Sequence, residues 1–276
     1  MNTIFDEMLS RYGVLTGKDL WNAKYEVTQQ IALAGLYRGG FFEKAAFYGG
    51  TCLRIFHGLK RFSEDMDFSL LAQGEDFHLE DYFPTVIDEF KSAGREVVIT
   101  KKDKMTLGKV ESAFLKDQTD VYNLTFQTEK SIKVKIEVDT KPPLSFQTEY
   151  KRLLHPYTFM ARCMTLPCLY AGKMHALAFR NWKTRVKGRD WYDFEWYVRN
   201  EVPLNYPHLQ ARILEFNGAK LEQADFVALL RERFSQADMA QVKRDVAPFL
   251  MNPKELDAWS NEYFVELLDR VKFETD

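Results

Sequence analysis

The sequence predicts an α+β protein, in which a mixed sheet with flanking helices, over residues 1–150, is followed by an all-α region, over residues 151–276. Two observations lead to this prediction. Segments rich in β-branched and aromatic residues lie in the first half of the chain, whereas segments with helical spacing of apolar residues fill the second half. A chain of 276 residues is also long enough for two domains of ordinary size.

Helices and strands are expected to alternate in the first half. Apolar residues at helical spacing predict a helix over residues 18–38, which a glycine pair ends. A second helix is expected over residues 78–94, interrupted or started near Pro84. A short strand that leads through a glycine turn into a short helix is expected over residues 45–58. The further expected strands span residues 66–71, 95–102, 121–128 and 131–140.

The last of these strands has a strictly alternating pattern, which predicts one buried face and one polar face. The apolar face carries Ile132, Val134, Ile136 and Val138. The polar face carries Lys133, Lys135, Glu137 and Asp139.

The second half is expected to be helical. Apolar residues recur there at helical spacing, and no solenoid repeat interrupts them. The expected helices span residues 167–180, 189–200, 206–217, 221–236, 239–251 and 256–273.

Composition limits the classes of protein that the chain can belong to. With 46% hydrophobic residues the chain can form a core, and its formal net charge of −2 requires any nucleic-acid partner to be held by a local basic patch. Cys52, Cys163 and Cys168 form no disulfide framework, and the last two lack the second ligand pair that a zinc site needs, so buried thiols are expected. No leader peptide and no membrane span is recognisable, so we expect a cytoplasmic protein with no membrane partner.

Two aspartates in the expected strand 66–71 and just before it raise a chemical question. Asp65 and Asp67 point to the same face of a strand, where their carboxylates repel each other and are costly to bury. A divalent cation such as Mg²⁺ resolves the repulsion because it prefers carboxylate oxygens. The alternative is a solvated strand edge with two surface aspartates.

The residues before the aspartates suit a phosphate group. Gly49 and Gly50 permit close backbone approach at a helix start, where N–H groups attract anions, and Thr51 adds a hydroxyl. Donors suited to phosphate oxygens follow at Arg54, Lys60, Arg61 and Ser63. A phosphate cradle followed by a carboxylate pair is what nucleotidyl transfer requires.

The stretch GGTCLRIFHGLKRFSEDMDFSLL, residues 49–71, resembles the signature of the AbiEii/AbiGii nucleotidyltransferase toxins, within the DNA polymerase β-like superfamily. The resemblance implies a nucleotidyltransferase-like catalytic domain over residues 1–150, with Mg²⁺ or Mn²⁺ held by Asp65 and Asp67. It also implies a third carboxylate on a neighbouring strand. Glu137 is favoured for this role and as a metal ligand, and Asp139 stays open. The alternative is that both are surface charges.

A second family element lies in the helical half. AGKMHALAFR, residues 171–180, and KGRDWYDFEWYV, residues 187–198, resemble the toxins' later motifs. The resemblance places four residues at the nucleotide, with a catalytic role for the first aspartate, so that residues 151–276 complete the nucleotide site. These four are Lys173, Arg189, Asp190 and Asp193. The alternatives are that Asp190 caps a helix and that Arg189 and Asp193 form a surface pair.

The resemblance implies a function as well as a fold. It predicts a Mg²⁺-dependent transfer of a nucleoside monophosphate from an NTP to an acceptor, by the toxin of a bacterial toxin–antitoxin or phage-defence system. The antitoxin would come from the adjacent gene. tRNA is a possible acceptor, other RNA or protein stays open, and the competing hypothesis is a non-catalytic module that binds nucleotide or RNA. A basic segment that can contact RNA carries Arg180, Lys183, Arg185, Lys187 and Arg189. The stacking candidates beside it are Trp182, Trp191 and Tyr192.

Overall fold

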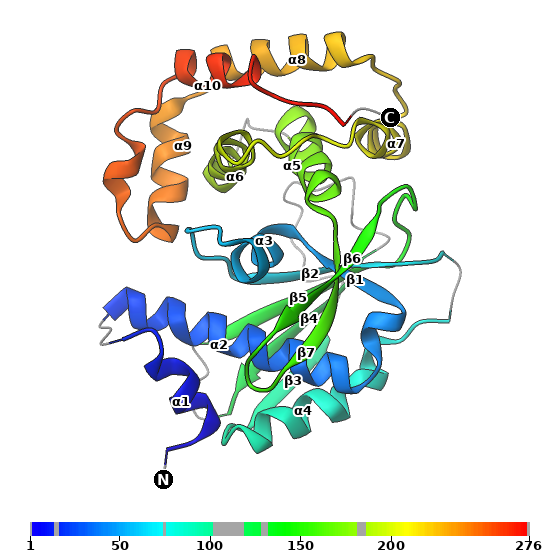
Figure 1. The fold of residues 1–276 in the computed structure, drawn as a ribbon, viewed down its shortest axis with the longest axis vertical. Coiled ribbons are helices and arrows are strands. Elements are labelled where there is room, and N and C mark those ends of the chain that lie inside the picture. Colours follow the sequence, from blue (N-terminus) through cyan, green and yellow to red (C-terminus); the bar gives the residue numbers. More distant parts are fainter. Residues whose placement is uncertain are drawn as a thin grey trace.

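A computed structural model gives the fold of this chain (Figure 1). The structure describes residues 2–13, 17–73, 76–101, 119–127, 132–180 and 186–274. These residues form a seven-stranded mixed sheet with helices, so the expected α+β class is confirmed.

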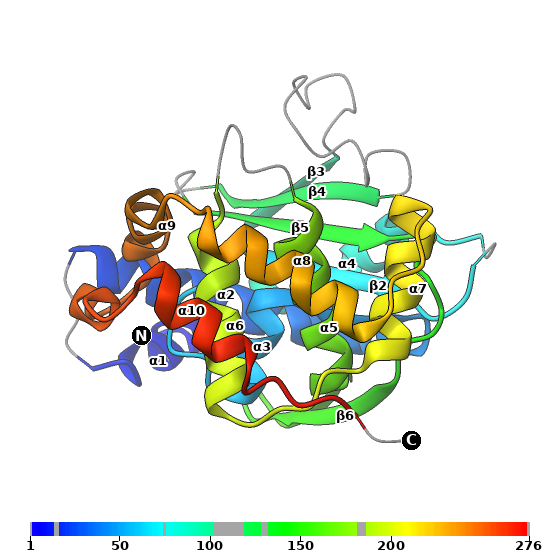
Figure 2. The same ribbon diagram turned by 90° about the horizontal axis from the view of Figure 1, so that it is seen from above.

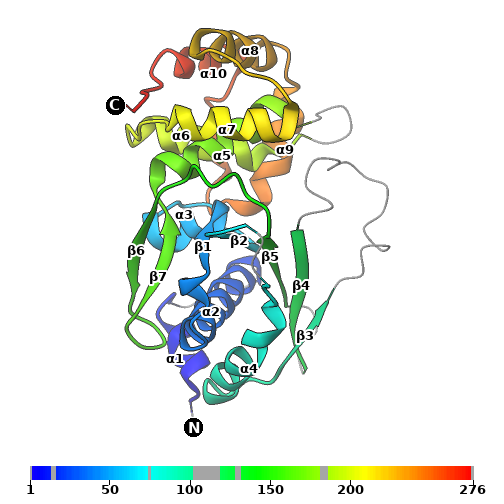
Figure 3. The same ribbon diagram turned by 90° about the vertical axis from the view of Figure 1, so that its right-hand side faces the viewer.

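The strand order in the sheet is β3-β4-β5-β2-β1-β7-β6. Strand β2 lies between β1, to which it is antiparallel, and β5, to which it is parallel. Figure 3 shows β6 and β7 at one edge of the sheet and β3 and β4 at the other. The strand bounds are β1 Ala45–Tyr48, β2 Asp65–Leu70, β3 Val97–Lys101, β4 Thr119–Phe126, β5 Lys133–Asp139, β6 Thr148–Leu153 and β7 Phe159–Met164.

Helices cover one face of the sheet and leave the candidate carboxylates on the other. Helix α2 (Gly17–Arg38) contacts both β5 and β7, and it packs against α4 (Phe83–Ser92). Phe47 and Phe68 lie side by side in β1 and β2 on the covered face and are buried there. Because side chains alternate along a strand, the neighbouring Asp67 points to the opposite face. Short helices complete this half: α1 Ile4–Ser10, η1 Phe41–Glu43, α3 Gly49–His57 and η2 Leu79–Tyr82.

From residue 166 onwards the chain forms a group of helices at one end of the sheet (Figures 1 and 2). Their core is aromatic, with the ring of Trp191 4.6 Å from that of Phe234 and 4.7 Å from that of Phe264. Trp191 and Tyr192 are both buried, so the expectation that they stack on a base is wrong. Gly188 starts α6 against α9, where a Cβ would overlap the carbonyl oxygen of Val242. The bounds are α5 Leu166–Phe179, α6 Gly188–Arg199, α7 Tyr206–Asn217, α8 Gln223–Ser235, α9 Met239–Val246, η4 Ala247–Phe249, η5 Pro253–Leu256 and α10 Asn261–Leu268.

Most expected elements are present near their expected positions, but the structure adds two strands and one α-helix that the sequence pattern does not predict. Strands β6 and β7 extend the sheet past residue 150, where only helices are expected. Strand β6 lies at the sheet edge and has the sequence TEYKRL, whose charged residues give it no strand-like apolar pattern. The third is helix α1, although Thr3 and Asp6 form a capping box that marks its start.

No helix in the described ranges is long and apolar enough to cross a membrane. The three cysteines are all buried and free, as expected from their sparse spacing.

Candidate active site

The register between β2 and β5 brings the three candidate carboxylates together. Asp67 is paired in register with Glu137 on the neighbouring parallel strand, and Asp65 is paired with Lys135. Because residues two apart on a strand share a face, Asp65, Asp67 and Glu137 all project from the same side of the sheet. The three candidate carboxylates are therefore neighbours on one face of the sheet.

The environment of Asp67 disfavours its negative charge. Burial, together with the charges of Glu137 and Asp65, raises the pKa of Asp67 to about 8. Lys135 opposes this effect, and its ammonium group forms an ion pair with the Glu137 carboxylate. A bound cation would stabilise the ionised form of this cluster of carboxylates.

Asp139 has a different place from Glu137. It is paired in register with Ser69, two residues beyond Asp67 along β2, and it is 4% exposed. Its Oδ1 accepts a hydrogen bond of 3.1 Å from the backbone N–H of Lys141, and burial raises its pKa. The interpretation of Asp139 as a solvated surface charge is therefore wrong, and its carboxylate helps to end the strand.

The glycine turn touches the carboxylates directly. Gly49 has a φ of +79°, and a Cβ at this position would overlap Asp67 Oδ2. A Cβ on Gly50 would lie 2.5 Å from Arg61 Nη2 and 3.1 Å from Ser63 Oγ. The pair thus allows the start of α3 to lie against Asp67 on one side and against the Arg61–Ser63 segment on the other.

Hydrogen bonds fix the Thr51 side chain and the backbone of Ser63. The buried Thr51 hydroxyl donates to the carbonyl oxygen of Asp65, so it ties α3 to the start of β2. Gln29, on α2, donates from Nε2 to the carbonyl oxygens of Ser63 at 2.9 Å and Glu64 at 3.1 Å. Sequence reasoning missed Gln29, whose only signal is a polar side chain on the apolar face of a helix.

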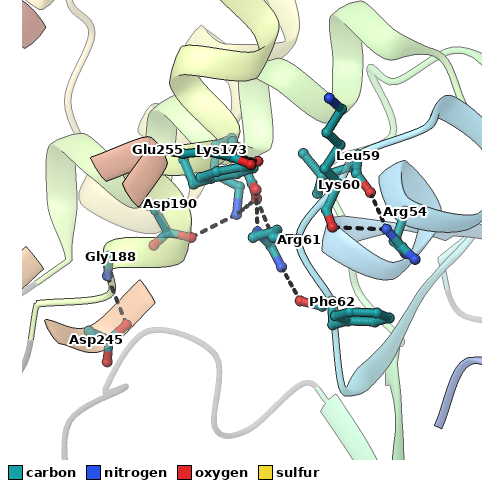
Figure 4. A network of polar contacts seen from close by, with 12 residues as sticks. Arg54, Leu59, Lys60, Arg61, Phe62, Lys173, Gly188, Asp190, Asp245 and Glu255 are labelled. Atoms are coloured by element: carbon teal, nitrogen blue, oxygen red, sulfur yellow. Dashed lines mark hydrogen bonds and ion pairs between the residues drawn. The ribbon is translucent and has the colours of Figure 1, made fainter. Parts of the chain in front are cut away.

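A buried charge network joins the sheet to the helices. The Arg61 guanidinium, 2% exposed, donates to both carboxylate oxygens of Asp193 at 2.5 and 2.6 Å. Lys173 Nζ lies 2.8 Å from Asp193 Oδ2 and 2.7 Å from Asp190 Oδ1. Figure 4 shows Arg61, Lys173 and Asp190 in this network. The two candidate motifs, far apart in sequence, therefore meet in one place.

Three positive charges lie near the carboxylate of Asp190 and stabilise its ionised form. Burial alone would raise its pKa, but the charges of Arg180, Lys173 and Lys187 outweigh burial and hold the pKa below its ordinary value. The Arg180 guanidinium forms an ion pair with Asp190 Oδ2. The N-cap position of α6 belongs to Lys187, so the interpretation of Asp190 as a helix cap is wrong.

Arg189 lies on the side of α6 that faces the loop before β2. Its Nη1 is 3.5 Å from Glu64 Oε2, and its guanidinium carbon lies 4.2 Å from the centre of the Phe249 ring. Asp193 is fully buried against Arg61, so a surface pair of Arg189 with Asp193 is also wrong. Of the expected basic segment, Lys183 and Arg185, together with Trp182, lie outside the described residues.

A second missed residue is Arg212 of α7. Its positive charge acts to lower the pKa of both Tyr48 and Asp139, so Arg212 lies near the end of the sheet that carries the carboxylates. Burial lowers the pKa of Arg212, and its Nε has no hydrogen-bond partner among the described residues. An arginine within a helical apolar pattern gives no sequence signal that it turns inward.

The donor set fits a hard divalent cation, although no complete cage is assembled. In the part of the chain that the structure describes, no three His, Cys, Asp or Glu side chains are arranged as metal ligands. Asp67 and Glu137 are nevertheless aligned on adjacent strands, and Gly49 leaves the space beside Asp67 Oδ2 free of a Cβ. Oxygen ligands from a few carboxylates, with the rest from water and substrate, are the usual environment of Mg²⁺.

Two solved structures have a similar fold. JHP933 from Helicobacter pylori superposes with a TM-score of 0.52 at 15% identity, over 90% of each chain. MenT4, a nucleotidyltransferase toxin from Mycobacterium tuberculosis H37Rv, superposes with a TM-score of 0.52 at 15% identity, over 96% of this chain and 98% of that one. No curated protein matches the sequence.

The family model described as nucleotidyl transferase AbiEii toxin, type IV toxin–antitoxin system, matches residues 31–269. This range contains the glycine turn, the three carboxylates and the buried charge network. The chain therefore belongs to the AbiEii family of nucleotidyltransferase toxins.

Proposed function

We propose that this toxin transfers a nucleoside monophosphate from an NTP to an acceptor hydroxyl at the face of the sheet that carries Asp65, Asp67 and Glu137. The observation that carries the proposal is the alignment of Asp67 with Glu137 on adjacent strands, in surroundings that raise the pKa of Asp67 to about 8. Paired carboxylates in such an environment favour the binding of a divalent cation. A cation held there can in turn bind the phosphate oxygens of a triphosphate. Membership of an enzyme family argues against a purely binding role.

Asp65, Asp67 and Glu137 would hold Mg²⁺ or Mn²⁺. When bound, such an ion neutralises phosphate charge and favours ionisation of an attacking hydroxyl. The chain's own contribution is to fix these carboxylates. Thr51 holds the backbone of Asp65, and Gly49 gives Asp67 its space.

Lys173 is the residue that we place at the triphosphate. Its side chain is 14% exposed, and Asp190 and Asp193 orient its ammonium group by two short ion pairs. Arg61 is too deeply buried for a direct phosphate contact in this arrangement, so it acts as a positioning residue through Asp193. Asp190 has the same kind of role, because it holds both Lys173 and Arg180.

Phosphate oxygens would also meet the glycine turn. The first backbone N–H groups of α3, at Gly49 and Gly50, have no helical partner and suit an anion. Ser63 Oγ lies beside Gly50, and Arg189, with a 14% exposed side chain, can reach the same side. Residues from the sheet, which continues through β7 past residue 150, and from the helices that follow it would thus complete one nucleotide site.

The acceptor that we propose is the 3′ end of tRNA. The chain has a net charge of −2, so an RNA must be held locally, and Arg180, Lys187 and Arg189 provide positive charge beside the network. A cognate antitoxin, encoded beside the toxin and active in the cytoplasm against this reaction, would complete a phage-defence system.

The test is a transfer assay with purified protein, total tRNA, Mg²⁺ and each of the four α-labelled NTPs in turn. We expect label on tRNA with at least one NTP, abolished by chelation and by Asp67→Asn. Asp88→Asn, an exposed aspartate on α4, is the matched control and should keep full activity. Full transfer by Asp67→Asn would overturn the proposed site, and label on protein instead of tRNA would overturn the proposed acceptor.

A further inference from the structure

Helix α7 carries an arginine that turns inward without a polar partner. The guanidinium carbon of Arg212 lies 5.2 Å from the centre of the Phe216 ring, but Arg212 forms no hydrogen bond or ion pair with any described residue. Its Nε is buried, while the residue as a whole is only half-buried, so a ligand can reach it. A desolvated positive charge is costly unless it is paired, so this position favours an anionic ligand.

Helix α7 holds Arg212 over the end of the sheet that carries the carboxylates. His208 precedes Arg212 by four residues, so the two lie on the same face of α7. His208 Nδ1 lies 2.9 Å from the hydroxyl of Ser145, in the segment that follows β5. The positive charge of Arg212 also acts to lower the pKa of Tyr48 and Asp139, at the ends of β1 and β5.

The strands below α7 carry further polar groups. Tyr48 is paired in register with Asp67, and Ser69 follows Asp67 by two residues, so all three lie on one face of the sheet. Ser69 Oγ and His208 Nε2 are buried and, like Arg212 Nε, have no hydrogen-bond partner among the described residues. Buried polar atoms are nearly always paired, so three such atoms on α7 and the strands below it indicate the place of a polar ligand.

Arg212 and the ammonium group of Lys173 lie on opposite sides of the carboxylates. Lys173 is held by Asp190 and Asp193 of α6, and Figures 1 and 2 show α6 and α7 on opposite sides of α5. In phosphoryl transfer the attacking and leaving oxygens are roughly in line, so an acceptor hydroxyl enters opposite the leaving pyrophosphate. With the triphosphate proposed at Lys173, the acceptor would therefore approach from the side of Arg212.

We infer that Arg212 binds the last phosphodiester group of the acceptor RNA and so places the terminal nucleoside beside Asp67 and Glu137. Two residues along a strand span about 6.6 Å, so the level of Ser69 lies about as far from Asp67 as a phosphate lies from the hydroxyl across its ribose. This inference rests on the proposed function, because it assigns a subsite for the same reaction. It concerns the last phosphodiester alone and leaves the basic residues near Asp190 to more distant parts of the RNA.

The test measures transfer by the full-length protein with Mg²⁺ and the NTP that the transfer assay selects. The acceptor is tRNA whose last phosphodiester is natural in one form and a neutral methylphosphonate in the other, with the adjacent 2′-hydroxyl absent from both. Arg212→Gln should raise the KM for the natural form about 10- to 100-fold, because a hydrogen bond between charged groups is lost, and should leave the KM for NTP unchanged. The neutral linkage should raise the KM of the wild type by a similar factor and that of Arg212→Gln hardly at all, because both changes remove the same contact.

Two controls separate ligand binding from a structural role. Arg199→Gln, at an exposed arginine of α6, should behave like the wild type with both forms of the tRNA. Arg212→Gln should keep the melting temperature of the wild type, since no described group of the chain pairs with its charge. A marked fall in that melting temperature would show that Arg212 supports the fold and would overturn the inference.

Two further results would overturn the inference and leave the proposed function standing. One is an unchanged KM for natural tRNA in Arg212→Gln, and the other is an equal effect of the neutral linkage on this variant and on the wild type. Label on protein instead of tRNA would remove the proposed acceptor and this inference together, with nucleotidyl transfer retained. If the wild type transfers no nucleotide with any NTP, the proposed function itself fails, and the inference fails with it.

Discussion

At the scale of single residues, Gly49 has two separate reasons to be glycine. Its φ of +79° lies in the left-handed region, and the carboxylate of Asp67 fills the space of a side chain. Gly58, at the other end of α3, has a φ of +75°, but no atom of the described residues lies within 4 Å of the place that a Cβ would take. Substitution of either glycine strains the backbone, but only substitution of Gly49 also disturbs Asp67. Comparison of the two variants therefore distinguishes the two effects.

Gly49→Ala should lower both stability and transfer. The left-handed conformation costs an alanine about 1–2 kcal/mol, and the new methyl group must also displace Asp67. A displacement of about 1 Å at a reacting group can reduce the rate about 100-fold. Gly58→Ala should lose similar stability in urea unfolding but keep its transfer rate. Equal activity of the two variants would show that Asp67 does not need its present position.

At the scale of elements, one ion pair connects the loop before β2 to helix α6. Arg61 and Asp193 are 132 residues apart in sequence, and both are buried. The backbone N–H of Phe62 also donates to the carbonyl oxygen of Phe249 at 2.9 Å. The position of Lys173 over the sheet therefore depends on this connection, since Asp193 holds Lys173 as well as Arg61.

Asp193→Asn should lower the free energy of unfolding more than Arg61→Met does. Asp193→Asn leaves the buried Arg61 without its carboxylate, which typically costs about 3–5 kcal/mol. Arg61→Met should cost less, because Asp193 keeps Lys173 at 2.8 Å. Urea unfolding of both variants checks the order. Arg231→Met, which breaks the exposed pair with Asp269, is the control and should cost less than about 1 kcal/mol. A larger loss for Arg61→Met would contradict this account of the network.

At the scale of the whole molecule, the sequence predicts local features well and long-range pairing poorly. The alternation over residues 132–138 identifies β5 and its polar face, because that pattern is local. The alignment of Glu137 with Asp67 depends on β2 and β5 becoming neighbours, which no local pattern specifies. The sequence favours a phosphate contact for Thr51, yet its hydroxyl bonds the backbone of Asp65, and only the tertiary structure reveals this partner.

One buried and two half-buried histidines should make the whole chain sensitive to acid. Burial lowers the pKa of His57 and His175 to about 4 and that of His208 to about 3, with Arg212 also disfavouring charge on the latter two. Their ordinary pKa is about 6.5, so the unfolded chain binds protons first as the pH falls. Stability is therefore present above about pH 6.5 and is lost progressively towards pH 4.

The variant His208→Asn tests this pH dependence. Each such histidine adds a slope of up to about 1.4 kcal/mol per pH unit to the unfolding free energy between the two pKa values. The variant should show a shallower loss between pH 6.5 and pH 4.5 than the wild type, measured by urea unfolding at each pH. His78→Asn, at an exposed histidine, should keep the wild-type slope. Parallel curves for His208→Asn and the wild type would contradict the assignment.

The extent of the sheet bears on how the molecule can be divided. Strand β1 lies between β2 and β7, so a fragment that ends at residue 150 leaves β1 as an edge strand and lacks β7. We expect fragment 1–150 to be unfolded by circular dichroism, and a fragment that continues through β7, to residue 165, to retain more structure. The intact chain should unfold in one calorimetric transition, since the Arg61–Asp193 pair crosses between its halves. A folded fragment 1–150 would show that the sheet does not need β7.

The order of the site residues along the chain has a consequence for protein synthesis. Asp67, Glu137, Lys173 and Asp193 leave the ribosome one after another, and a chain is made from its N-terminus onwards. On the site proposed above, a nascent chain that lacks residue 193 has neither an anchored Lys173 nor a compensated Arg61. On this site the nascent toxin would thus stay inactive towards its acceptor until residue 193 has left the ribosome and folded against Arg61.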